Sequence, residues 1–159
     1  MIKLTVLCCT QVLDWESDMQ LVNMIVAVGH YGQIGLGGTM PWSYSENPVT
    51  KARNSLDLQI FRKVTTDGIL IAGKKTYDVV KPKIDFANTN RILVQYKKEV
   101  PIEPMLEGFK HHLPNRQIWV IGGGFTYEAF APFINGVVIK SFMKDYFGPA
   151  DTYLYDDIW

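Results

Sequence analysis

Two kinds of hydrophobic pattern alternate along this chain. Apolar runs of strand length, mostly without polar alternation, occupy residues 21–29, 68–72, 91–95, 117–121 and 137–142. Apolar side chains recur at helical spacing in the segments 55–66, 74–80, 104–112 and 125–133. The first kind of run is typical of strands buried on both faces. Its alternation with helices predicts an α/β fold with crossover helices. Because such sheets bind ligands outside the carboxyl ends of their strands, the residues that follow each strand are the candidates for chemistry.

The composition fits one globular domain spanning residues 1–159. The length is close to the roughly 150 residues of an average domain, and 47% hydrophobic against 20% charged residues is typical of a folded chain. Sixteen basic and sixteen acidic residues give a formal net charge of zero. This balance argues against a whole-protein field for nucleic acid or an anionic membrane surface. The apolar runs are also far shorter than the ~18 residues of a membrane span.

The first residues and the cysteines bear on the cellular compartment. The initial apolar stretch is too short for a signal peptide, and Thr10 and Gln11 stand where a small-residue cleavage site would be. We therefore predict a strand over residues 2–12. Cys8 and Cys9 are neighbours, so on a strand they point to opposite faces and neither bridge nor pair around a metal. We expect a reduced, cytoplasmic protein without a metal site.

Two corners between a strand and a helix have the features of phosphate-binding loops. The glycines at 122–124 follow one strand, and glycines let a backbone approach a ligand closely. Gly73 follows another strand and precedes Lys74, Lys75 and Thr76. Two lysines in the first turn of a helix oppose its dipole unless an anion binds there. Each corner also has a simpler explanation: a tight turn accounts for the glycines, and solvent-exposed lysines need no ligand. Two such corners in one small sheet nevertheless favour a bound dinucleotide.

Asp57 has two interpretations. With Asn54 as the N-cap of the helix, Asp57 falls at the third helical position and caps the free N–H groups. Alternatively, Asp57 shares an apolar stripe with Phe61 and Val64, flanked by Leu58, at the spacing of one helix face. Burial on such a stripe raises the pKa of a carboxyl group, and a nearby helix N-terminus lowers it. The second interpretation makes Asp57 a proton-linked partner for a small polar ligand.

A glycine-rich segment at residues 33–42 is the remaining candidate. Its apolar end, Met40-Pro41-Trp42, suits a mobile flap that excludes water from a site. The alternative is an ordinary loop packed by Trp42. The chain contains neither the Gly-x-Ser-x-Gly elbow nor the His-Glu-x-x-His and Walker motifs.

Taken together, these segments resemble dihydrofolate reductase. Residues 24–28, Ile34-Gly35 and Met40-Pro41-Trp42 are similar to that family's first strand and catalytic flap. Asp57-Leu58, with Phe61 and Thr65, resembles the family's active-site helix. Residues 73–76 resemble its second cofactor corner. The family's most recognisable signature matches residues 120–124 with Tyr127, Glu128 and Phe130, including an expected cis peptide between Gly122 and Gly123. Asp151-Thr152 resembles a late element of the family.

The resemblance implies a fold and a reaction. The fold is a mixed, mainly parallel central sheet flanked by helices. The reaction transfers hydride from NADPH to C6 of 7,8-dihydrofolate with protonation of N5, which gives tetrahydrofolate for one-carbon metabolism. Antifolates would bind the same site. The oligomeric state stays open between a monomer and a homodimer.

The resemblance also assigns roles to residues. Asp57 would bind the 2-amino group and N3 of the pterin and promote protonation. Met40 would close the flap, Trp42 would help to hold a water near Asp57, and Tyr127 would lie near the nicotinamide. The substrate contacts would be Ile25, Val26, Ala27, Leu58, Phe61, Arg62, Val80, Ile84, Arg91 and Ile121. The cofactor contacts would be Ala27, Ile34, Gly35, Gly73, Lys74, Lys75, Thr76, Gln95, Gly122, Gly123, Gly124, Phe125, Thr126 and Tyr127.

Some features depart from the family pattern. Asp57 follows Trp42 by fifteen positions (57 − 42), more than is usual, so residues 44–53 are expected to form an inserted loop over the substrate entrance. Arg91 directly precedes its strand, so either Arg91 or Arg62 would grip the glutamate tail of the substrate. The family's threonine behind the carboxylate falls at Lys140 or Ser141.

The N-terminal segment is a further departure. Residues 1–22 are expected to form an extension, and the family continues with two more antiparallel strands beyond the point that Trp159 matches. We expect the strand over 2–12 to replace the missing C-terminal strand by pairing antiparallel beside residues 137–142. Without some cover that sheet edge would be exposed.

Two other functions stay open at this point. One is a reductase of the same fold that acts on a ribosylated pyrimidine, as in riboflavin synthesis; Asp57 and Met40-Pro41-Trp42 favour the folate enzyme instead. The other is a non-catalytic folate- or nucleotide-binding module. Turnover of dihydrofolate with NADPH, blocked by methotrexate, distinguishes an enzyme from such a module.

Overall fold

A computed structural model describes residues 3–7 and 19–154 of the chain. Its main sheet has six strands in the order β1-β7-β2-β6-β4-β5, and every pairing in it is parallel. The strands are β1 (Lys3–Leu7), β2 (Val22–Gly29), β4 (Ile69–Ala72), β5 (Ile92–Gln95), β6 (Ile118–Gly122) and β7 (Val137–Met143). A small antiparallel sheet joins β3 (Gln33–Gly35) to β8 (Thr152–Tyr153). The predicted mainly parallel α/β fold is confirmed.

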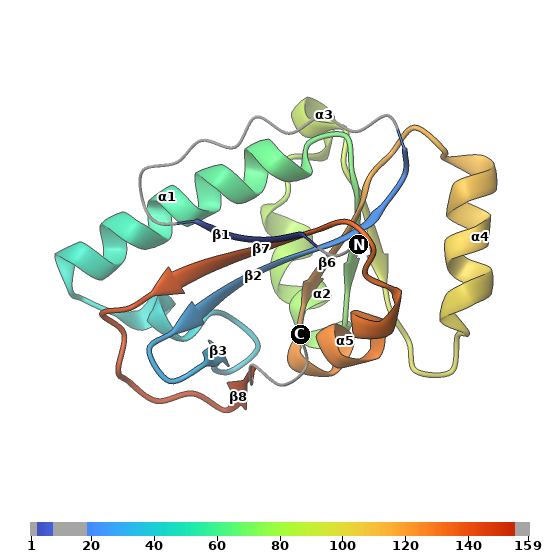
Figure 1. Cartoon of the computed structure of the whole chain (residues 1–159). Helices are drawn as coiled ribbons and strands as arrows, with labels where there is room; N and C mark the ends of the chain where they lie inside the picture. Colours follow the sequence, from blue (N-terminus) through green and yellow to red (C-terminus); the bar gives the residue numbers. More distant parts are fainter. Residues whose placement is uncertain (1–2, 8–18, 155–159) are drawn as a thin grey trace.

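Helices lie between the successive parallel strands β2, β4, β5, β6 and β7 (Figure 1). The α-helices are α1 (Pro48–Thr65), α2 (Lys74–Val80), α3 (Phe86–Thr89), α4 (Ile102–His112) and α5 (Gly124–Phe130). Short 3-10 turns are η1 (Pro41–Tyr44), η2 (Lys81–Lys83) and η3 (Ala131–Phe133). No helix in the described ranges is long and apolar enough to cross a membrane.

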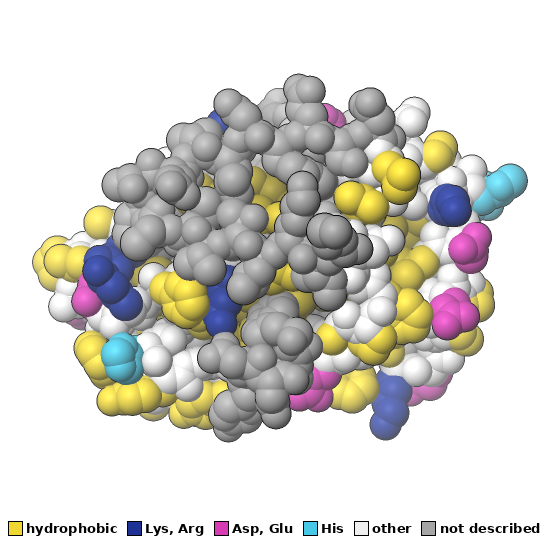
Figure 2. All heavy atoms as spheres, in the orientation of Figure 1, with side chains coloured by type: hydrophobic (Ala, Val, Ile, Leu, Met, Phe, Trp, Pro, Cys, Tyr) yellow, Lys and Arg dark blue, Asp and Glu magenta, His cyan; other side chains and the backbone are white. Residues whose placement is uncertain are grey.

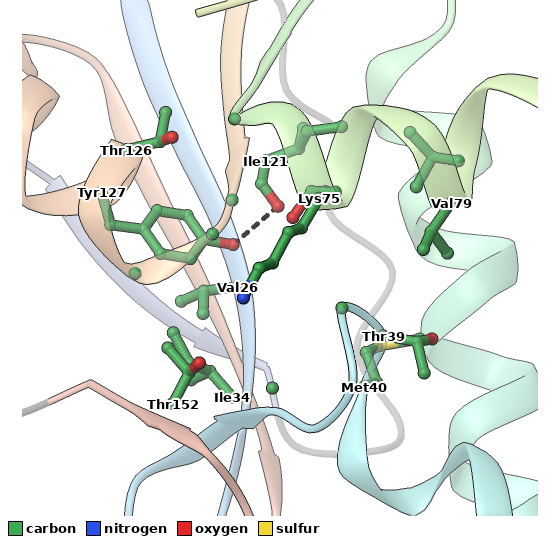
Figure 3. A pocket seen from close by; sticks show the side chains of 18 of the residues that line it. Val26, Ile34, Thr39, Met40, Lys75, Val79, Ile121, Thr126, Tyr127 and Thr152 are labelled. Carbon is green, nitrogen blue, oxygen red and sulfur yellow. Dashed lines mark hydrogen bonds between the residues drawn. The ribbon is translucent and has the colours of Figure 1, made fainter. Parts of the chain in front are cut away.

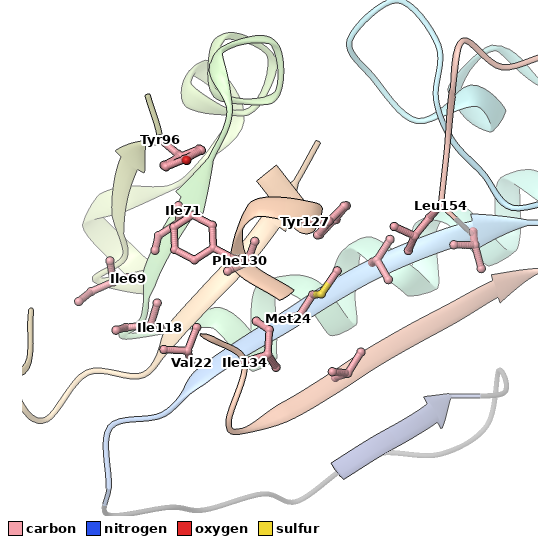
Figure 4. Close-up of a cluster of buried hydrophobic side chains, with 14 residues drawn as sticks. Val22, Met24, Ile69, Ile71, Tyr96, Ile118, Tyr127, Phe130, Ile134 and Leu154 are labelled. Atoms are coloured by element: carbon pink, nitrogen blue, oxygen red, sulfur yellow. The ribbon is translucent and has the colours of Figure 1, made fainter. Parts of the chain in front are cut away.

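Both faces of the sheet are buried, which explains the unbroken apolar runs. Successive strand residues point to opposite faces, and in β2 Met24 and Val26 join one buried cluster while Ile25 joins the other. The larger cluster, drawn in Figure 4, contains Phe130 of α5 and packs against Phe109 of α4. On the opposite face, side chains of α1 pack against Ile25 and Trp119. The sheet is therefore a layer between helices.

The start of α1 differs from the prediction. Asn54 was expected to be the N-cap, but the helix begins at Pro48 and its N-cap is Asn47, whose side chain accepts hydrogen bonds from the N–H groups of Val49 and Thr50. Asparagine followed by proline is a strong helix start, because the side chain satisfies free N–H groups and proline has none to lose. The predicted loop over 44–53 is therefore wrong for residues 48–53, which are helical. Asp57 lies in the middle of the helix and is not a capping residue.

The N-terminal strand also differs from the prediction. Lys3–Leu7 pairs with β7 at the edge of the sheet, as expected, but the pairing is parallel. Residues 8–21 separate β1 from β2, and a connection of a dozen or more residues is long enough for a crossover between parallel strands. The rest of the predicted strand, at residues 2 and 8–12, lies outside the described residues.

The glycine-rich segment after β2 is anchored rather than free. Gln33 and Gly35 pair with β8, and the N–H of Gly37 donates to the carboxylate of Asp151 at 2.9 Å. Its last part, Met40-Pro41-Trp42, runs into η1. The expectation of a mobile loop over all of 33–42 is therefore wrong at its first residues, because β8 supplies backbone partners.

Candidate active site

A cavity of about 530 Å³ opens at the carboxyl ends of β2, β4 and β6. Its floor includes Ile25, Val26 and Ala27 of β2, and its walls come from α1 and α2. Most of the predicted site residues line it: Ile34, Gly35, Met40, Asp57, Leu58, Phe61, Gly73, Lys74, Lys75, Thr76, Val80, Ile121, Gly122, Gly123, Gly124, Phe125, Thr126 and Tyr127. The predicted phosphate-binding corners and the predicted acid thus belong to one cavity.

Five predicted residues do not line the cavity. They are Trp42, Arg62, Ile84, Arg91 and Gln95. Trp42 is 1% exposed and its indole N–H donates to Asn54 at 3.1 Å, so it fastens η1 to α1. Ile84 packs into the sheet-face cluster beside α1, and Gln95 pairs with Ala72 within the sheet.

Two acids, Asp57 and Asp151, line this cavity, and Asp57 is the less exposed of the two. It is only partly accessible, and burial raises the pKa of its carboxyl group, while a hydrogen bond from Ser141 partly offsets that rise. Ser141 is a buried residue of β7. Of the two residues that the sequence offered as the partner behind the carboxylate, Lys140 and Ser141, the structure therefore selects Ser141. The alternative residue, Lys140, instead places its Nζ 4.9 Å from the centre of the Phe142 ring.

Tyr127 joins two strands beneath the cavity. Its hydroxyl is 2.9 Å from the carbonyl oxygen of Ile25 in β2. It is also 2.8 Å from the carbonyl oxygen of Ile121 in β6, a hydrogen bond drawn in Figure 3. Burial, helped by the charge of Asp57, raises the pKa of Tyr127, so the phenol stays protonated and remains a donor. Tyr127 therefore links β2 to β6 at the floor of the cavity.

The two glycine corners lie against each other. The N–H of Gly73 donates to the carbonyl of Gly122 at 2.7 Å, and the predicted cis peptide joins Gly122 to Gly123. A Cβ at Gly73 would lie 2.6 Å from Thr126 Oγ1, and one at Gly124 would lie 2.8 Å from Thr152 Cγ2. Both distances are too short for a side chain. At Gly123 a Cβ would meet only Thr76 Oγ1, at 3.5 Å, so this backbone faces open space in the cavity.

Cations line the same part of the cavity. Lys75 extends toward Val26 and Tyr127 (Figure 3). Lys74 is exposed and pairs with Asp78 at 2.9 Å. Lys98 lies over the ring of Phe125 at 5.9 Å, and that ring stacks with Tyr96 at 6.4 Å.

The site predicted from sequence was incomplete. The lining also includes Gly38, Thr39, Val79, Tyr96, Lys98, Asp151 and Thr152. Tyr96 directly follows a predicted strand, so its position at a carboxyl end was a usable signal. Thr39 belongs to the glycine-rich segment 33–42 that the sequence had already singled out, whereas Val79 gave no such signal, because only the folded chain brings it to the cavity.

On the face seen in Figure 2, basic, acidic and apolar side chains of the described residues are interspersed. Within residues 3–7 and 19–154, no group of His, Cys, Asp and Glu side chains is arranged to hold a metal ion.

The fold and cavity define a class of protein. A parallel sheet with one largely apolar cavity at its strand ends, one buried acid and a glycine corner is typical of an α/β enzyme acting on a small molecule. The family model for dihydrofolate reductase matches residues 21–156. The chain belongs to the dihydrofolate reductase family, a family of oxidoreductases.

Individual relatives differ in their named substrates. The chain is 30% identical over 138 residues to dihydromethanopterin reductase of Methylorubrum extorquens, covering 87% of this chain and 92% of that protein. It is 31% identical over 129 residues to dihydrofolate reductase type 9 of Escherichia coli, covering 74% of this chain and 67% of that protein. A solved structure of dihydrofolate reductase from Enterococcus faecalis, complexed with NADP(H) and RAB-propyl, has a similar fold. Its TM-score is 0.63 at 18% identity, covering 86% of this chain and 77% of that one.

Proposed function

We propose that this protein reduces 7,8-dihydrofolate to tetrahydrofolate, with hydride transfer from NADPH to C6 and protonation of N5. The observation that carries the proposal is the position of Asp57. It is the less exposed acid of a largely apolar cavity, its pKa is raised by burial, and the glycine corner opens into the same cavity. The proposal combines that geometry with membership of the dihydrofolate reductase family.

The pterin end of the substrate suits Asp57. The 2-amino group and N3–H of a dihydropterin are adjacent donors, and an ionised carboxylate accepts two parallel hydrogen bonds. The apolar walls given by Leu58, Phe61 and Val80 would cover the faces of the ring. Burial also raises the pKa of this carboxyl group, which brings the pKa nearer to the pH at which a general acid or base works best.

The other half of the cavity fits NADPH. Gly123 has room for a close ligand, and side chains at Gly73 or Gly124 would clash, so the corner is built around bare backbone. Lys74, Lys75 and Lys98 would face the phosphates of the cofactor, including its 2′-phosphate. When bound, the reduced nicotinamide supplies the hydride. Met40 and Thr39 line the cavity from the flap and would exclude water during the transfer.

The direct test follows NADPH oxidation on addition of dihydrofolate, with methotrexate as inhibitor. We expect turnover that methotrexate blocks. Asp57→Asn should lower kcat at neutral pH by about 10²–10⁴-fold, the usual contribution of a positioned acid or base, with an unchanged circular dichroism spectrum. The matched control is Asp67→Asn, which makes the same chemical change at a residue bonded to Asn90 and outside the cavity. Binding without turnover, or full activity of Asp57→Asn, would overturn the proposal.

A second candidate substrate is a dihydropterin with a different tail. The 30% identical relative is named for dihydromethanopterin, and neither Arg91 nor Arg62 lines the cavity in which a glutamate tail was expected to be gripped. The pterin chemistry at Asp57 is the same for both substrates. Comparing kcat/KM for dihydrofolate with that for dihydromethanopterin decides between them.

A further inference from the structure

Two cations and one acid border the wall of the cavity beyond Phe61. Arg62 of α1 forms an ion pair with Asp85, the N-cap of α3, with 3.4 Å between Nη2 and Oδ2. Arg91 lies behind the same wall, since its guanidinium carbon is 5.8 Å from the centre of the Phe61 ring. Burial and the charge of Arg62 lower the pKa of Arg91, whereas Asp85 raises it, so the three charges act on one another.

The tail of a bound dihydropterin would leave the cavity near this cluster. The cavity follows α1 from Asp57 past Leu58 to Phe61. A helix rises about 1.5 Å per residue, so Arg62 lies roughly 7–8 Å along α1 from Asp57. A pterin held at Asp57 through its 2-amino side directs C6, which carries the tail, away from the acid. A tail that outgrows the cavity therefore passes close to Arg62.

Neither arginine is free to meet an anionic tail. Arg91 is 7% exposed and donates from Nε to Thr89 at 2.8 Å and from Nη1 to Thr65 at 3.3 Å. The side chain of Arg62 is 56% exposed, which makes it the more accessible cation, but Asp85 already pairs with it.

Asp85 is itself fixed in place. The backbone N–H of Asn88 donates to its Oδ1 at 3.1 Å, and the side-chain amide of Asn88 donates to its Oδ2 at 2.8 Å. These bonds resist displacement of Asp85 by an incoming carboxylate. A carboxylate tail must then share Arg62 with a second negative charge, whereas an uncharged tail meets no repulsion.

We propose that Asp85 is a specificity-determining residue, which pairs with Arg62 and so disfavours tails that carry carboxylates relative to short or uncharged tails. The proposal rests on the proposed dihydropterin reductase activity and concerns the tail alone. Asp85 would discriminate between substrates by repelling tails that carry carboxylates, in addition to any attraction of the site for short or uncharged tails.

The test compares 7,8-dihydrofolate with 6-methyl-7,8-dihydropterin, which has no anionic tail. Asp85→Asn removes the charge and keeps a side-chain oxygen for the Asn88 N–H. We expect KM for dihydrofolate to fall about two- to fivefold, the size of one partly exposed ion pair, with kcat unchanged and with both constants for the methyl compound unchanged. The difference should shrink at high salt, because salt screens exposed charges.

Two further variants control the result. Glu107→Gln makes the same change in net charge on α4, and it should leave the KM for dihydrofolate unchanged. In an Arg62→Gln background, Asp85→Asn should lose most of its effect, since the cycle isolates the coupling between the two side chains.

The outcomes separate the two proposals. An unchanged substrate preference in Asp85→Asn, or an equal change in Glu107→Gln, overturns the role of Asp85 while reduction of both dihydropterins continues. If the wild-type protein reduces neither compound, the proposed function fails, and the role of Asp85 fails with it.

Discussion

The hydroxyl of Tyr127 offers a quantitative test of how the cavity floor is held. Tyr127→Phe removes one donor from a side chain that is 4% exposed. Two carbonyl oxygens, of Ile25 and Ile121, lie within 2.9 Å of that hydroxyl, but a single proton satisfies only one of them at a time. The variant therefore loses one buried hydrogen bond, and a carbonyl left without its donor costs about 1–3 kcal/mol.

The expected loss can be measured by melting and by denaturant titration. For a domain of this size, 1 kcal/mol corresponds to about 2–4 °C in Tm, so Tyr127→Phe should lower Tm by roughly 2–12 °C. The matched control is Tyr31→Phe, because Tyr31 is 63% exposed and surface changes usually stay within about 0.5 kcal/mol. If the two variants are equally stable, the hydroxyl does not hold β2 to β6 and the reasoning fails.

Three other predictions follow from the same contacts. Burial raises the pKa of Asp57 above its ordinary value of 3.8, so the unfolded chain releases this proton first as pH rises, and the folded state loses stability across that interval. Asp57→Asn should therefore have a higher Tm than the wild type at neutral pH but the same Tm below pH 3.8. Equal Tm values at both pH values would contradict the raised pKa. Gly124→Ala places a Cβ 2.8 Å from Thr152 Cγ2 and should cost about 1–3 kcal/mol in urea unfolding, with recovery in the Thr152→Ser background, which lacks that methyl group. Deleting residues 1–20 removes β1 from the edge of β7 and should cause aggregation visible by light scattering; a monodisperse, active truncation would refute the role of β1.

Local rules were sufficient where one segment determines its own structure. The glycines at 122–124 and the lysines after Gly73 predicted two strand-to-helix turns, because a tight turn of this kind is specified by residues adjacent in sequence. The start of α1 was missed although its signal was also local. Asn54 was a plausible cap, but Asn47 followed by Pro48 is a stronger one, and the longer helix frees Asn54 to accept the indole N–H of Trp42.

Contacts between distant segments could not be derived in this way. Ser141 reaches Asp57 across the interface between β7 and α1, and the choice between Ser141 and Lys140 depends on which face of β7 each residue occupies. A shift of one residue along a strand exchanges the two faces, so the sequence left the partner undecided. The direction of β1 is a similar case, because nothing within residues 3–7 distinguishes parallel from antiparallel pairing with β7.

The contacts beyond Phe61, at the end of the cavity proposed to face the substrate tail, could also not be derived from local sequence. The resemblance assigned an anionic tail to Arg91, which directly precedes its strand, or to Arg62. Whether an arginine can accept a ligand depends on which acceptors already hold its donors, and those acceptors come from elsewhere in the chain: Thr65 and Thr89 for Arg91, and Asp85 for Arg62. An ionised ligand gains from a cation only what remains after the cation's existing partners are displaced. Under the role proposed for Asp85, substrate preference at this end would be set by residues that do not line the cavity.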